Sequence, residues 1–147
     1  MKAFAETLDY GVSPERLHRI MVYPDTLPDL SASTGSWRPD ELPPRVGTLV
    51  RIRSKLLRMQ FPFEVVTRFT ELTPPWHMVT ELLRPRLVTM RWALDLEEVP
   101  GGTRATNSFE VSWRWWAAPI GHVFAAILHR EVRNGMRKLL ARLGPPR

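Results

Sequence analysis

Three polar side chains that interrupt apolar strand faces are the residues of this sequence best suited to recognise a ligand. Thr67, Thr80 and Asn107 each stand among Phe, Val, Met or Ala residues on one side of a predicted strand. A hydroxyl or amide buried in such a setting needs a hydrogen-bond partner. We expect these groups to line a cavity and to bond a ligand's carbonyl or hydroxyl. The alternative is that they bond the backbone or one another.

Few ionisable side chains are placed for acid–base chemistry. Glu131 falls at the edge of the apolar stripe of a predicted C-terminal helix. If buried, it could accept a proton; at the rim it would pair with a neighbouring Arg. Glu6 is the other acid predicted to point inward. Arg51 or Arg53 would point inward only if their strand were bulged or shifted by one residue. These residues do not decide whether the protein is an enzyme.

Several catalytic and metal-binding signatures are missing from the sequence. It has no Cys, which excludes disulfides and Cys-ligated zinc. Its four histidines (His18, His77, His122 and His129) show no metal-ligand spacing, so we expect surface imidazoles. No nucleophile elbow, phosphate loop or zincin motif occurs. We therefore expect neither a metal nor a cofactor.

Length and charge limit the remaining classes of function. The 147 residues predict one domain, residues 1–147, and the net charge is +6. The arginines are scattered and alternate with acids along the predicted strands, so we expect no nucleic-acid binding. No apolar run reaches the ~20 residues that span a bilayer, and the first ten residues are not those of a signal peptide. We expect a cytoplasmic protein without a membrane span.

Period-two alternation over most of residues 46–116 predicts the strands that position the polar groups. Each predicted strand has one apolar and one polar face, which is typical of antiparallel pairing with one face to solvent. Val65, Met78, Trp92 and Phe109 stand on the apolar faces. Gly101-Gly102 predicts a hairpin between the last two strands.

Helical patterns flank this strand-rich region. Residues 119–143 predict one long helix of about 37 Å, with apolar residues at Ile120, Val123, Phe124, Ile127 and further positions three or four apart. A strand over residues 1–10, of ambiguous alternation, precedes the helix start Ser13-Pro14-Glu15. Residues 23–30 predict a turn or a second short helix, and residues 31–37 a short strand.

This order of elements resembles the helix-grip fold of the START-like (SRPBCC) superfamily, in particular its polyketide cyclase/dehydrase and lipid-transport branch. The resemblance covers nearly the whole chain. It implies an α+β fold in which a curved antiparallel sheet wraps around a long C-terminal helix, with one or two short helices after the first strand. Its local signals are the Ser-Pro-Glu helix start, a Pro-rich loop before Val46-Gly47-Thr48, Phe69-Thr70-Glu71-Leu72-Thr73-Pro74-Pro75, and Pro100-Gly101-Gly102-Thr103-Arg104.

The resemblance also implies a function, because members bind apolar ligands between sheet and helix. We expect a small lipid-like or polyketide-like ligand; the alternative is an aromatase/cyclase-like or dehydratase-like enzyme, with Glu131 as the candidate catalytic residue. The predicted ligand-binding residues are Val65, Thr67, Met78, Thr80, Trp92, Asn107, Phe109, Phe124 and Ile127.

A cluster of tryptophans lies where the last strand meets the long helix. Trp113, Trp115 and Trp116 could form a cavity mouth or a rim that makes transient membrane contact, since Trp suits a half-wet interface. They could equally pack under the helix start or form a dimer contact. A monomer and a homodimer therefore both remain open.

Overall fold

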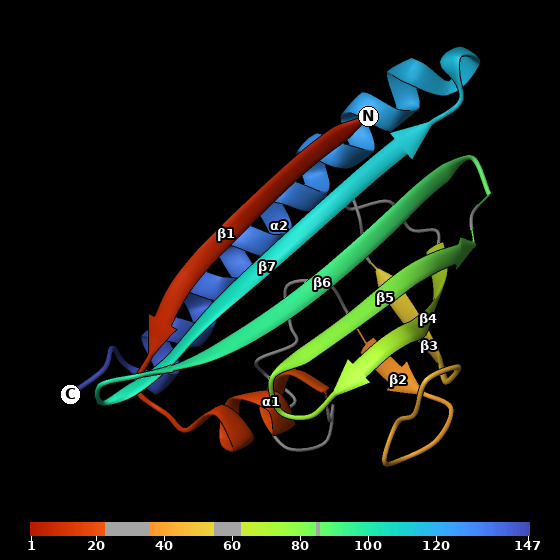
Figure 1. The fold of residues 1–147 in the computed structure, drawn as a ribbon. Coiled ribbons are helices and arrows are strands. Elements are labelled where there is room, and N and C mark those ends of the chain that lie inside the picture. The colour runs from red at the N-terminus through yellow and green to blue at the C-terminus, as the bar shows by residue number, and fades with distance from the viewer. Residues whose placement is uncertain (23–35, 55–62, 85) are drawn as a thin grey trace.

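A computed structural model describes residues 1–22, 36–54, 63–84 and 86–147. Within these ranges, seven antiparallel strands form one curved sheet in the order β1-β7-β6-β5-β4-β3-β2 (Figure 1). The strands are β1 (Lys2–Tyr10), β2 (Ser36–Pro39), β3 (Leu49–Ser54), β4 (Phe63–Thr73), β5 (His77–Arg84), β6 (Val88–Val99) and β7 (Gly102–Trp113). The helices are α1 (Pro14–Val22) and α2 (Ala118–Leu143), and a 3₁₀ turn, η2 (Trp115–Ala117), precedes α2.

The predicted α+β architecture is confirmed. Helix α2 returns along β1 and β7, with which it makes its closest contacts (Figure 1). The prediction for residues 23–30 lies outside the described residues, as does most of the strand predicted over residues 31–37. Within the described residues, no helix combines the length and the apolar run needed to cross a bilayer.

The hairpin between β6 and β7 forms where the two glycines predict it. Gly101 has a φ of 78°, a left-handed conformation that costs glycine nothing. The ladder then pairs every residue from Val99 opposite Gly102 to Val88 opposite Trp113. This long regular pairing determines on which face of the sheet each side chain of the two strands lies.

Two register shifts bend the neighbouring pair β4 and β5. They fall between Val66 and Thr67 and between Phe69 and Glu71. An irregularity of this kind bends a strand and increases its twist. Beyond β3, the short β2 forms the edge of the sheet, where Pro39 costs no ladder hydrogen bond.

The strand predicted to start at Val46 begins later, at Leu49. Val46 is 63% exposed, and the turn before the strand is held by the Arg45 amide donating to Thr48 Oγ1 at 2.9 Å. Gly47, with a φ of 97°, makes this turn possible. The period-two pattern therefore begins three residues before the strand does.

The structure resolves the ambiguous alternation of β1. Phe4 stacks on Phe109 of β7, with ring centroids 5.0 Å apart, and the Tyr10 hydroxyl donates to the backbone oxygen of Met136 in α2 at 3.2 Å. The even-numbered residues of β1 therefore face α2, and the small residues Ala3 and Ala5 face the other way.

The face that α2 presents to the sheet differs in part from the predicted stripe. Its buried residues are Gly121, Ala125, Met136 and Leu139. A Cβ on Gly121 would overlap the Trp113 ring, so this glycine lets the helix approach β7 closely. Ile120 and Val123, two members of the predicted apolar stripe, do not pack on the sheet: both are more than half exposed, because the approach at Gly121 turns them away from it.

Helix α1 starts as predicted, with the Arg16 amide donating to Ser13 Oγ at 3.3 Å. The helix buries Leu17, Val22 and also His18. The prediction of a surface imidazole is wrong for His18, since it follows Leu17 on the face that packs against the core. Burial without a charged partner lowers its pKa below the ordinary value.

The core consists of two clusters on the same side of the sheet. The closed-end cluster lies beside α1 and contains Tyr10, Val12, Leu17, Val22, Val50, Phe69, Met78, Leu94, Leu96, Ala105 and Leu139. The open-end cluster lies near the start of α2 and contains Val88, Met90, Phe109, Val111 and Ala125. Trp92 packs against both clusters.

Candidate functional site

A row of aromatic side chains crosses the face of the sheet that α2 covers. Phe4, Phe109 and Trp92 are cross-strand neighbours on β1, β7 and β6. The Trp92 and Phe109 rings are stacked with centroids 5.9 Å apart. On β5 and β4 the same row continues with Thr80 and Phe69. The predicted residues Trp92, Phe109 and Thr80 are thus brought together.

Asn107 is joined to other protein groups. Its Oδ1 accepts from Trp92 Nε1 at 2.8 Å, and its Nδ2 donates to the Met136 sulfur at 3.3 Å. The amide thereby links β6, β7 and α2. Of the two interpretations, internal bonding accounts for both ends of this buried amide.

The two threonine hydroxyls have no such partner. Thr67 is 1% exposed and Thr80 is fully buried, and neither Oγ1 has a hydrogen-bond partner. Thr67 lies opposite Leu82 and Thr80 opposite Phe69, so the two threonines are diagonal neighbours on β4 and β5, roughly 7 Å apart. Since a buried hydroxyl without a partner costs free energy, these two atoms are the unusual feature of this face.

The other predicted wall residues occupy different positions. Met78 is buried in the closed-end cluster, two residues along β5 from Thr80. Phe124 packs against the open-end cluster, and Ile127 is half-buried on α2. Val65 pairs with Ile52 in the β3–β4 ladder, and its side chain lies outside the described residues. Phe4 was missed, although its bulk against Ala3 and Ala5 was a usable signal.

Glu6 is committed to an ion cluster in the seam between β1 and α2. Its Oε1 lies 2.7 Å from His129 Nε2 and 3.0 Å from Arg133 Nη2. The hydrogen bond with His129 is the main cause that lowers the pKa of Glu6. His129 also stacks on Phe4 at 4.2 Å, so it is partly covered. This cluster fastens α2 to the edge strand of the sheet.

Glu131 lies on α2 away from that seam, seven residues after Phe124 and so on the same side of the helix. Its side chain is 26% exposed, and Arg130 Nη2 lies 3.8 Å from its Oε1. Arg51 is exposed and pairs with Asp40 at 3.5 Å, so it does not join an inward group. The Arg53 side chain lies outside the described residues.

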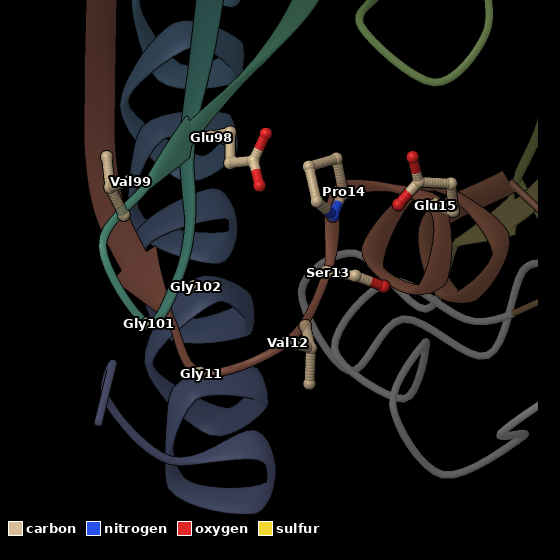
Figure 2. A pocket seen from close by; sticks show the side chains of 9 residues that line it. All are labelled: Gly11, Val12, Ser13, Pro14, Glu15, Glu98, Val99, Gly101 and Gly102. Atoms are coloured by element: carbon tan, nitrogen blue, oxygen red, sulfur yellow. The ribbon is translucent and has the colours of Figure 1, made fainter.

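A separate pocket of about 320 Å³ opens between the β1–α1 connection and the β6–β7 hairpin (Figure 2). Figure 2 shows the carboxylates of Glu15 and Glu98 on either side of Pro14. No predicted ligand-binding residue lines this pocket; its lining is Gly11, Val12, Ser13, Pro14, Glu15, Glu98, Val99, Gly101 and Gly102. In the described part of the chain, no group of three or more His, Asp or Glu side chains is arranged to hold a metal ion.

Solved structures with the same arrangement of elements are numerous, whereas no model of a protein family and no curated protein matches the sequence. Norcoclaurine synthase from Thalictrum flavum is similar with a TM-score of 0.67 and 14% identity, over 95% of this chain and 86% of that chain. A protein from Rhodobacter sphaeroides is similar with a TM-score of 0.65 and 18% identity, over 97% and 93%.

An HSP90 activator from Plasmodium falciparum is also similar, with a TM-score of 0.57 and 20% identity, over 75% of this chain and 73% of that chain. The names of these proteins differ widely, and at such identities the likeness concerns the fold alone. The chain has the helix-grip fold predicted from its resemblance to the START-like superfamily.

Proposed function

We propose that this protein binds a small apolar ligand, lipid-like or polyketide-like, between the curved sheet and α2. The observation that carries the proposal is the pair of buried, unpartnered hydroxyls of Thr67 and Thr80. A ligand carbonyl or hydroxyl between sheet and helix would supply the missing partner. The polar parts of the ligand would then lie toward β4 and β5.

The neighbouring side chains support an apolar and partly flat ligand. Trp92 and Phe109 present stacked rings beside Thr80, and Met78 adds a flexible apolar wall. A mostly apolar lining with a few polar groups is typical of small-molecule sites. Norcoclaurine synthase, which shares the fold, has been solved in complex with dopamine and hydroxybenzaldehyde, two small aromatic molecules. Phe124, Ile127 and Val65 complete the proposed wall, and Asn107 supports it by fixing Trp92.

The direct test is titration of the purified protein with a fatty acid, a polyketide panel and an environment-sensitive apolar dye. We expect one ligand per chain, displacement of the dye by the ligand, and weaker binding by Trp92→Ala. Absence of binding across the whole panel would contradict the proposal. Native mass spectrometry would reveal a co-purified molecule and its class.

Substituting the threonines separates a ligand-binding role from a structural one. Thr80→Val keeps the shape and removes a hydroxyl that has no partner, so we expect the free energy of unfolding of the free protein to rise by about 1 kcal/mol. The same change should weaken binding of an oxygen-bearing ligand about tenfold, a loss of ~1.4 kcal/mol. Thr103→Val is the matched control, because Thr103 Oγ1 donates to the Val12 backbone oxygen at 2.7 Å. That variant should lose stability and keep binding. A loss of stability in Thr80→Val would show that its hydroxyl is bonded within the protein.

The alternative function is an aromatase/cyclase-like or dehydratase-like enzyme in the same space. The position of Glu131 favours it, because this carboxylate shares the Phe124 side of α2 and its Arg130 contact is long. Glu131→Gln should then abolish turnover of a polyketide substrate while ligand binding persists. Unchanged turnover would remove Glu131 from the reaction.

A further inference from the structure

The end of the molecule where β7 passes into α2 carries a large exposed apolar surface. Trp115 is 88% exposed, Trp116 52%, Ile120 56% and Val123 55%. Exposed side chains of this size gathered in nine residues are typical of an interaction site rather than of ordinary surface. We call these four residues the tryptophan tip.

The ladder places further residues at the same end. Val88 pairs with Trp113, so the turn with Arg86 and Leu87 lies beside the chain leaving β7 at Arg114. Lys2 pairs with Val111, which brings the start of β1 to the same end. Figure 1 shows the N-terminus, the end of β7 and the start of α2 together there.

The charges around the tryptophan tip have one sign. Lys2, Arg84, Arg86 and Arg114 are all exposed. No acid occurs in residues 1–5, 82–94 or 111–130 of the sequence. Glu110 on β7 and Glu81 on β5 are the nearest acids on those strands, and both lie opposite Arg91 of β6. The tip is therefore an apolar surface with a basic surround.

We propose that the tryptophan tip docks on an anionic lipid surface. Trp favours the boundary between headgroups and acyl chains, and each nearby Arg or Lys adds attraction to anionic lipid. A second copy of the chain fits less well. In a two-fold dimer through this tip, the basic residues of both copies would share an interface without an acid from these segments. The proposal does not depend on the proposed ligand binding.

The test is co-sedimentation of the full chain with vesicles of phosphatidylcholine mixed with phosphatidylglycerol. We expect binding that weakens at high salt and is much weaker on phosphatidylcholine alone. The double variant Trp115→Ala/Trp116→Ala should lose at least about tenfold in affinity. Arg86→Gln and Arg114→Gln should each lose about fivefold. Matched controls are Trp76→Ala, at the other end of the sheet beside Leu96, and Arg16→Gln on α1; both should bind like the parent protein.

Three outcomes would overturn the proposal: no binding to anionic vesicles, equal binding by the tip variant, or equal binding to neutral vesicles at all salt concentrations. Sedimentation equilibrium distinguishes the second-copy alternative, because a dimer that Trp115→Ala/Trp116→Ala dissociates would assign the tip to self-association. Dye binding measured in the same variant shows separately whether the ligand site is intact.

Discussion

The closed end and the open end of the interface between the sheet and α2 use similar side chains to different effect. At the closed end, α1 covers the sheet, and Tyr10, Leu17 and Phe69 have no exposed surface. At the open end, the buried Val111 and Ala125 are surrounded by half-buried residues such as Phe124 and Leu128. Beyond them lies the exposed tryptophan tip. One end is built for stability, and the other keeps apolar surface available.

The buried hydroxyls also fall into two groups. The closed end pairs its buried hydroxyls: Tyr10 donates to the Met136 backbone and Thr103 to the Val12 backbone. Thr67 lies opposite Val50 and Thr80 opposite Phe69, at the border of the closed-end cluster, and both hydroxyls remain without a partner. A fold can leave such groups unpaired only if stability elsewhere is sufficient, since each costs about 1–3 kcal/mol. The comparison suggests that the closed end supports the site.

The largest expected effect is on the free energy of unfolding, and it compares the closed end with the open end within α2. Leu139→Ala at the closed end removes a side chain that is 6% exposed, so the free energy of unfolding should fall by about 2–5 kcal/mol. Leu128→Ala at the open end removes a half-buried side chain and should cost about 1 kcal/mol. Urea denaturation of both variants measures the difference. Equal losses would mean that the two ends contribute equally.

A smaller effect on the free energy of unfolding is expected at Asn107 and Trp92, where the two clusters meet. Asn107→Leu removes the acceptor of Trp92 Nε1 and should cost about 1–3 kcal/mol. Combining it with Trp92→Phe should cost less than the sum of the single variants, because the two residues share the bond. Strict additivity in denaturation experiments would show that the bond contributes nothing.

The smallest expected effect concerns pH. Burial in the closed end lowers the pKa of His18, whereas hydrogen bonds to Glu71 and Asp95 raise the pKa of the half-buried His77. For His18 the unfolded state binds the proton more tightly, so its contribution to stability is full above ~6.5 and is lost as pH falls below that value. For His77 the contribution is full below ~6.5 and is lost as pH rises through the raised pKa.

An NMR titration of the ring protons measures both histidines in one experiment. We expect one pKa midpoint below and one above the ordinary histidine value, and His18→Leu should reduce the loss of stability just below ~6.5. A normal midpoint for His18 would show that water reaches the closed end.

Local sequence patterns were sufficient to predict most of the helices and strands. The Ser13 cap, the glycine hairpin at Gly101 and the end of α2 before Gly144 all depend on residues close in sequence. Errors arose where distant contacts decide: His18 is buried by packing of α1, and Ile120 is exposed because Gly121 approaches Trp113. For the site, alternation predicted the inward face of Thr80 and Trp92. It could not predict that Asn107 is already bonded to Trp92 and Met136, which are 15 and 29 residues away.

By itself, the sequence determined the period of each segment and hence the order of strands and helices, because side-chain alternation and capping act within a few residues. Only the tertiary structure decided which buried polar groups find partners and which apolar side chains remain exposed. Both depend on the distance between segments far apart in the chain. The unpaired hydroxyls of Thr67 and Thr80 and the exposed ring of Trp115 are consequences of that packing.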